Sequence, residues 1–231
     1  HRPGVAFPVL IPNLQGFEAA LAAGARDIAV FASASETFSH RNINCSIADS
    51  LERFRPVMAA AGEAGVRVRG YLSCTLGCPY EGPVPLAAVV AVAARLYRMG
   101  CAEVVPSDTI GAATPRQAAA MVAAVTTEVP VQALAFHAHD TWGMAVANCL
   151  AVYEAGVRTF DGSAGGLGGC PYAEGATGDV ATAALVYLFE GQGIATGVAL
   201  AAVVRVALTA CAALDRTPTA PITRLWQTRC S

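Results

Sequence analysis

The sequence predicts an α/β fold in which short apolar strands alternate with helices around a parallel sheet. One recurring pattern carries this prediction: an Ala-rich helical stretch ends at a glycine, and an apolar strand follows within a few residues. The glycines are Gly24, Gly65, Gly100 and Gly156. Glycine just past a helix end adopts the left-handed cap conformation without strain. The strands that follow are nearly all apolar, as is typical of parallel strands covered on both faces.

Six strands are expected, because the segments FPVLIP and VQALAFHA add two to the four that follow glycines. We place them near residues 7–12, 27–33, 66–73, 103–106, 131–137 and 158–163. Two helix starts are also marked. Ser46 precedes Asp49 in an arrangement that resembles a capping box, and Thr114 is followed by Pro115 and Gln117. Spacing alone does not separate an open doubly wound sheet from a barrel. The chain shows no linker, so a single domain is expected.

Composition narrows the classes of function. Hydrophobic residues make up 55% of the 231 residues, which is enough for a buried core. The formal net charge of −2 gives no electrostatic reason to expect nucleic acid or an anionic membrane as a partner. No secretory or other targeting segment is visible, and the charge-free run 191–204 is too short to span a bilayer. We therefore expect a cytoplasmic or mitochondrial matrix protein whose cysteines are thiols.

Two histidines, His137 and His139, end an apolar segment. Side chains at i and i+2 of a strand point to the same side of the sheet. Two neutral imidazoles placed in this way can chelate a divalent metal, with oxygen ligands completing the shell. The alternative is one buried, hydrogen-bonded histidine and one surface histidine, and the two residues alone leave both interpretations open.

Three more residues are candidates for the site. Cys170 lies in the Gly-rich loop GGLGGCPYAEG, which is either a mobile loop that presents a thiol as acid or base, or a flexible loop with an inert thiol. Asp108 lies at the end of the fourth strand. Its carboxylate is either catalytic or a cap of the loop that follows. Asp179 precedes another expected helix. It is either the N-terminal cap of that helix or a carboxylate metal ligand.

Together these segments resemble the 3-hydroxy-3-methylglutaryl-CoA lyase family, within the wider DRE-TIM metallolyase group. The similar segments cover nearly the whole chain and include PVLIPNLQGFEAALAAGA, NINCSIADSLERF, FHAHDTWGMAVAN and GLGGCPYAEGATGD. The HxH pattern is shared with related synthases and aldolases, whereas the GLGGCPYA loop is much more specific to the lyase. The resemblance implies a (β/α)8 TIM barrel whose active site lies at the carboxyl ends of its strands.

The resemblance also implies roles for the candidate residues. His137, His139 and Asp179 would bind Mg²⁺ or Mn²⁺, although the family usually has Asn in place of Asp179. Cys170 and Asp108 would be catalytic. The reaction implied is cleavage of 3-hydroxy-3-methylglutaryl-CoA to acetyl-CoA and acetoacetate.

The Gly-rich loop would form the substrate loop, with Gly168, Gly169 and Tyr172 near an acyl-CoA substrate. Family members are often dimers, so a homodimer is one expected assembly. The chain supplies about six of eight β/α units, because the family's first two strands, with a metal-binding Asp, an Arg and a Glu, would precede Phe7.

We therefore expect residues 1–231 to form one N-terminally incomplete barrel domain without lyase activity of its own. Two alternatives stay open at this point. One is another acyl-CoA or 2-oxo-acid lyase or synthase of the same barrel group. The other is a non-catalytic remnant that acts as a binding scaffold.

Overall fold

The structure is a computed structural model that describes residues 4–171 and 178–230. Its strands form one six-stranded sheet in chain order, and every neighbouring pair is parallel. The strands are β1 (Val9–Leu10), β2 (Asp27–Ser33), β3 (Arg67–Ser73), β4 (Glu103–Asp108), β5 (Ala135–Ala138) and β6 (Thr159–Phe160). The predicted α/β class and the predicted set of six parallel strands are confirmed.

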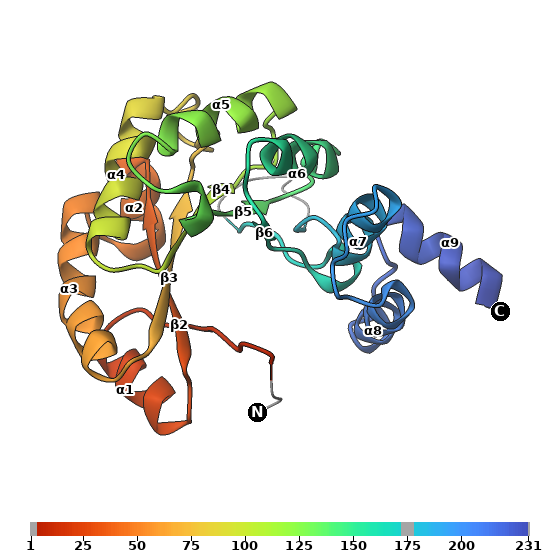
Figure 1. The fold of residues 1–231 in the computed structure, drawn as a ribbon, viewed down its shortest axis with the longest axis horizontal. Coiled ribbons are helices and arrows are strands. Elements are labelled where there is room, and N and C mark those ends of the chain that lie inside the picture. Colours follow the sequence, from red (N-terminus) through yellow and green to blue (C-terminus); the bar gives the residue numbers. More distant parts are fainter. Residues whose placement is uncertain (1–3, 172–177, 231) are drawn as a thin grey trace.

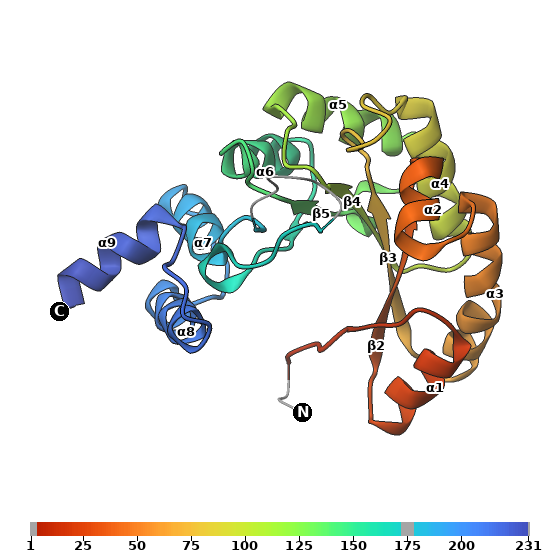
Figure 2. The same cartoon turned by 180° about the vertical axis from the view of Figure 1, so that it is seen from behind.

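The helices connect the strands, and the described chain forms an open arc (Figure 1). They are α1 (Leu14–Ala22), α2 (Glu36–Ile43), α3 (Ile47–Glu63), α4 (Leu86–Arg98), α5 (Pro115–Val125), α6 (Ala145–Glu154), α7 (Thr182–Gly191), α8 (Leu200–Ala213) and α9 (Pro221–Cys230). Helices α1 to α4 lie along the outer side of β2 and β3 at one end of the arc, and α7 to α9 form its other end (Figure 2). None of the described helices is both long enough and apolar enough to cross a membrane.

Short local signals set the ends of several helices. The Ser46 hydroxyl accepts a hydrogen bond from the backbone N–H of Asp49 at 3.0 Å and begins α3. At the start of α5, the side chain of Gln117 accepts one from the backbone N–H of Thr114 at 2.9 Å. The four glycines predicted to end helices all have positive φ: Gly24, Gly65, Gly100 and Gly156. The local predictions at these sites are confirmed, because each signal acts within a few residues.

Side chains of the central strands alternate between two environments. Ile28, Val30 and Leu72 belong to the main hydrophobic core and are at most 1% exposed. Tyr71 and Ser73, on either side of Leu72 in β3, point to the opposite side and line a cavity. The helices therefore cover the outer face of the sheet, and its inner face is available for a functional site.

The sheet is strongly curled. The hydroxyl of Tyr71 on β3 donates to Asp161, just after β6, at 2.8 Å. Strands β4 and β5 lie between these two strands in the sheet. In a flat sheet three strand spacings would separate them by about 14 Å. The hydrogen bond therefore crosses the interior of an arc, as expected for part of a barrel.

Several strand boundaries differ from the prediction. β1 and β6 lie at the two ends of the sheet, where a strand has one neighbour, and only two residues of each belong to the strand. β5 begins later than predicted, because Val131–Ala133 form a 3₁₀ turn. β4 continues to Asp108, which pairs with Ala138 of β5. Apolar patterning located these strands but did not show where ladder pairing starts and stops.

Candidate metal centre and active site

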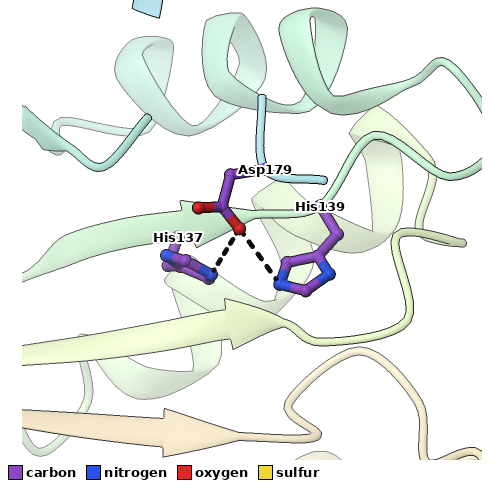
Figure 3. A group of neighbouring side chains, drawn as sticks. All are labelled: His137, His139 and Asp179. Carbon is purple, nitrogen blue, oxygen red and sulfur yellow. Dashed lines mark ion pairs between the residues drawn. The ribbon is translucent and has the colours of Figure 1, made fainter. Parts of the chain in front are cut away.

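Two histidine side chains meet one carboxylate at the carboxyl end of β5 (Figure 3). His137 lies in β5 and His139 follows it, so both imidazoles point the same way. Asp179 Oδ1 lies 3.5 Å from Nε2 of His137 and 3.3 Å from Nε2 of His139. One potential ligand atom from each residue lies within 4.8 Å of the other two. The structure thus brings together the three residues predicted as metal ligands.

Asp179 reaches the histidines because its backbone pairs with the segment at the end of β5. An antiparallel bridge joins Asp179 to His139, and the backbone N–H of Val180 donates to the carbonyl of Ala138 at 2.9 Å. Helix α7 begins after this segment, with Ala181 at its N-cap position. Asp179 therefore does not cap the helix, and its carboxylate faces the two imidazoles instead.

Gly168 packs its backbone against the carboxylate of Asp179. Its backbone φ is +110°, a conformation that residues with a side chain rarely adopt. A Cβ atom at this position would lie 3.3 Å from Asp179 Oδ2. The Gly-rich loop therefore supplies a bare backbone surface beside the candidate ligand, which a larger residue would disturb.

The donor set suits a divalent cation. Two imidazole nitrogens and one carboxylate oxygen form a mixed set that transition metals accept, and the carboxylate also suits hard cations such as Mg²⁺. His139 is buried, whereas His137 and Asp179 are partly exposed toward the interior. Three protein donors leave coordination positions for oxygen atoms of a substrate. The residues therefore fit a divalent ion.

A second carboxylate faces the other ring nitrogen of His137. Asp161 Oδ2 lies 3.4 Å from His137 Nδ1. Asp161 also accepts hydrogen bonds from Tyr71 at 2.8 Å and from Arg69 at 3.0 Å, and Arg69 forms an ion pair with the buried Glu103. Sequence reasoning missed this cluster. The available signal was the placement of polar side chains at alternate positions of the otherwise apolar third strand.

The surrounding charges shift the pKa values of the site. Burial lowers the pKa of His137, but the contact with Asp161 and the charge of Asp179 outweigh burial, so this pKa is raised above its ordinary value. Burial and the nearby His137 lower the pKa of His139. Burial tends to raise the pKa of the Asp161 carboxyl, but His137 and the charge of Arg69 outweigh burial and hold this pKa below its ordinary value. The nearby carboxylates therefore favour the charged form of His137, whereas burial and His137 disfavour that of His139.

The candidate metal centre opens into a cavity of about 590 Å³ inside the curled sheet. Gly169 and Cys170 of the Gly-rich loop line this cavity together with His137 and His139. Cys170 is half-buried. A ligand in the cavity would therefore contact both imidazoles and the thiol. Tyr172, also predicted for the substrate loop, lies outside the described residues.

Comparison with known proteins identifies the family. Residues 4–209 match the model of the HMGL-like family. The hydroxymethylglutaryl-CoA lyase of Pseudomonas mevalonii is 58% identical over 203 residues, which are 88% of this chain and 67% of that protein. This chain belongs to the hydroxymethylglutaryl-CoA lyase family. The mitochondrial hydroxymethylglutaryl-CoA lyase of Gallus gallus is 54% identical over 214 residues, 93% of this chain and 72% of that protein.

Solved structures of the lyase family show the same architecture. The crystal structure of hydroxymethylglutaryl-CoA lyase from Pseudomonas aeruginosa is 51% identical and superimposes with a TM-score of 0.96, covering 99% of this chain and 76% of that one. The curled six-stranded sheet is therefore part of a TIM barrel, as predicted. Against these relatives the chain spans about two thirds to three quarters of their length.

One relative has been solved with ligands. The lyase structure from Acinetobacter baumannii contains coenzyme A and 3-methylmalate. It is 32% identical, with a TM-score of 0.92, and the match covers 97% of this chain and 73% of that one.

A more distant protein shares the fold alone. The carboxyl transferase domain of Rhizobium etli pyruvate carboxylase has a TM-score of 0.67 at 20% identity, and the match covers 89% of this chain and 34% of that one.

Asp108 lies apart from the cavity in this lyase-family chain. It is fully buried, and its carboxylate accepts hydrogen bonds from the backbone N–H groups of Ala112 at 3.3 Å and Ala113 at 3.1 Å. Burial raises the pKa of Asp108 to about 6. The geometry is that of a loop cap, the alternative that the sequence left open. Its catalytic role stays a prediction.

Proposed function

We propose that this chain, joined to the upstream β/α units that the family resemblance implies, forms a metal-dependent carbon–carbon lyase that cleaves 3-hydroxy-3-methylglutaryl-CoA to acetyl-CoA and acetoacetate. The observation that carries the proposal is the convergence of His137, His139 and Asp179 on a cavity that also exposes Cys170. Family membership supports the same reaction, because the relatives that share this site region are named hydroxymethylglutaryl-CoA lyases.

The metal would be Mg²⁺ or Mn²⁺, held by His137, His139 and Asp179. When bound, such an ion supplies a Lewis acid that orients oxygen atoms of the substrate and makes its tertiary hydroxyl more acidic. The extra negative charge of Asp179, relative to the usual Asn, favours a cation in this position.

The reaction needs one proton removed and one proton delivered. When the tertiary hydroxyl loses its proton, its oxygen becomes the ketone of acetoacetate and the carbon–carbon bond breaks. The electron pair of that bond passes to the acetyl-CoA fragment as an enolate. The thiol of Cys170, in the wall of the same cavity, would give the enolate carbon its proton. The Gly-rich loop around Cys170 would keep water away while this happens.

The substrate class is an acyl-CoA. Coenzyme A and 3-methylmalate in the Acinetobacter baumannii relative support this class. A related lyase or synthase that acts on another acyl-CoA or on a 2-oxo acid would use a similar metal centre, and a scaffold protein would use none. A substrate profile of the active protein therefore distinguishes the three alternatives.

The direct test is acetoacetate release in the presence of Mg²⁺ or Mn²⁺. We would join residues 1–231 to the upstream β/α units that the family resemblance implies, taken from the Pseudomonas mevalonii lyase. This extended protein should release acetoacetate from 3-hydroxy-3-methylglutaryl-CoA, and its His137→Ala variant should not. Preference for a different substrate, or activity that persists in the variant, would contradict the proposal.

A further inference from the structure

Two hydrogen-bond donors and one ring nitrogen of His137 converge on the carboxylate of Asp161. Its Oδ1 accepts from Arg69 at 3.0 Å, its Oδ2 accepts from the hydroxyl of Tyr71 at 2.8 Å, and Nδ1 of His137 lies 3.4 Å from Oδ2. We propose that Asp161 is a positioning residue that keeps the proton of neutral His137 on Nδ1 and leaves the Nε2 lone pair for the metal. This inference rests on the metal centre of the proposed function.

The neighbours of Asp161 make its carboxylate an acceptor. The guanidinium of Arg69 can only donate, and because it also donates to the Tyr71 hydroxyl at 3.0 Å, that hydroxyl directs its proton at Asp161. Each ring nitrogen of His137 faces a carboxylate, Nδ1 that of Asp161 at 3.4 Å and Nε2 that of Asp179 at 3.5 Å. A bare Nδ1 would place its lone pair against Asp161, whereas a bare Nε2 would share a bound metal with Asp179. Neutral imidazole carries a single N–H, so a proton on Nδ1 leaves Nε2 as the metal-binding atom.

The cluster also fixes the orientation of the ring. Arg69 and Tyr71 lie on β3, across the interior from Asp161, and the buried Glu103 on β4 pairs with Arg69. The ring of Tyr71 meets that of His137 edge-on, with centroids 6.0 Å apart and an interplanar angle of 85°. Rotation of the imidazole would therefore break both the contact with Asp161 and the edge-on contact with Tyr71.

His139 has a different environment. Its Nδ1 is buried, with no hydrogen-bond partner among the residues that the structure describes. The backbone bridge to Asp179 places His139 instead. Removal of the Asp161 carboxylate should therefore change the protonation site of His137 and leave that of His139 unchanged.

The test reads the imidazole nitrogens by ¹⁵N NMR in the metal-free 231-residue chain, at a pH well above the pKa of His137. The chain has four histidines, and a His137→Gln variant assigns the relevant signal. We expect the Nδ1–H form in the wild-type protein and the Nε2–H form in Asp161→Asn. In this variant the amide oxygen stays with Arg69, and the amide NH₂ turns toward Nδ1. An Nε2–H form in the wild-type protein would overturn the inference, whether or not the variant folds.

Mn²⁺ binding by the extended protein and its Asp161→Asn variant, followed by electron paramagnetic resonance, separates this inference from the proposed function. Loss of a partner behind a ligating histidine typically weakens metal binding 10–100-fold, so we expect about that loss in Asp161→Asn. The control Tyr71→Phe disturbs the same cluster but retains the carboxylate, so His137 should keep its Nδ1–H form. If the extended wild-type protein binds no Mn²⁺, the metal centre is wrong and the NMR result still decides the role of Asp161. Equal Mn²⁺ affinity and an unchanged His137 signal in Asp161→Asn contradict that role.

Discussion

The thiol of Cys170 lies in the wall of the cavity that contains His137 and His139. Cys170 packs against the small cluster of Phe38, Cys74 and Cys78 rather than against the main core. Because Cys170 is only half-buried, loss of its sulfur should lower stability only slightly. We expect Cys170→Ala to reduce turnover of the extended protein about 10²–10⁴-fold, the usual effect of losing a general acid or base. The temperature of unfolding should hardly change. Steady-state acetoacetate release and thermal unfolding measure the two effects, and near-wild-type turnover rules out the proton-transfer role.

Asp108 should make stability depend on pH. Burial raises its pKa in the folded protein from 3.8 to about 6, so folding favours the protonated carboxyl. The stabilisation that the protonated Asp108 gives is fully present below pH 3.8, the pKa of this group in the unfolded chain, and is lost as the pH rises through about 6. A shift of two units corresponds to about 3 kcal/mol at most.

Urea unfolding of wild-type protein and Asp108→Asn between pH 4 and 7 measures the effect. The wild-type free energy of unfolding should fall relative to that of the variant as the pH rises, because Asn does not ionise. A difference between the two proteins that stays constant over this range shows that Asp108 does not titrate in it.

The residues of the site were predictable to different degrees. His137 and His139 stand two positions apart at the end of one strand, so strand geometry alone places them together. Asp179 and Cys170 needed the family resemblance, because their loop has no regular period. Asp161 was missed, since its partner Tyr71 lies 90 residues away and meets it only when the sheet curls.

At the scale of single elements, the Gly-rich loop holds a candidate ligand in place. We expect Gly168→Ala to weaken Mn²⁺ binding, because the new Cβ would press on the carboxylate of Asp179 and the backbone would be strained at φ +110°. Gly191 is a suitable control, because a Cβ there would meet no atom within 4 Å. Isothermal titration calorimetry measures the Mn²⁺ affinity of the Gly168→Ala and Gly191→Ala variants of the extended protein. Equal affinities in the two variants would show that the loop does not support Asp179.

Helices and strands differed in how well the sequence defined them. Helix ends follow local rules, so Ser46, Thr114 and the cap glycines marked them correctly. Strand ends depend on neighbours that are distant in the chain. β1 and β6 have one partner each in the sheet, and β5 is shortened by the turn at Val131–Ala133.

At the scale of the whole molecule, the described chain is an open arc of a barrel (Figure 1). Leu10 on the end strand β1 is 60% exposed, and Val206 and Leu214 at the other end are 59% and 58% exposed. Apolar side chains at both ends of the arc are therefore in contact with water. Upstream β/α units of the kind found in a closed barrel would cover them.

We expect the 231-residue chain alone to release no acetoacetate, because the resemblance places an Asp ligand and an Arg in upstream strands. The extended protein should unfold at a higher temperature and show activity. Parallel assays of the two proteins, with His137→Ala as the control for contaminating enzyme, measure this. Metal-dependent turnover by the chain alone, absent from its control, shows that the upstream strands are not required.

The most direct test of the metal centre is the stoichiometry and affinity of Mn²⁺ binding to the extended protein and to its His137→Ala/His139→Ala double variant. The two imidazoles face Asp179 in the structure, so the wild-type protein should bind one Mn²⁺ per chain at this position. The double variant should lose this binding while its circular dichroism spectrum and unfolding temperature stay close to those of the wild-type protein. Equal Mn²⁺ affinity in the folded double variant would contradict the assignment of these residues as metal ligands.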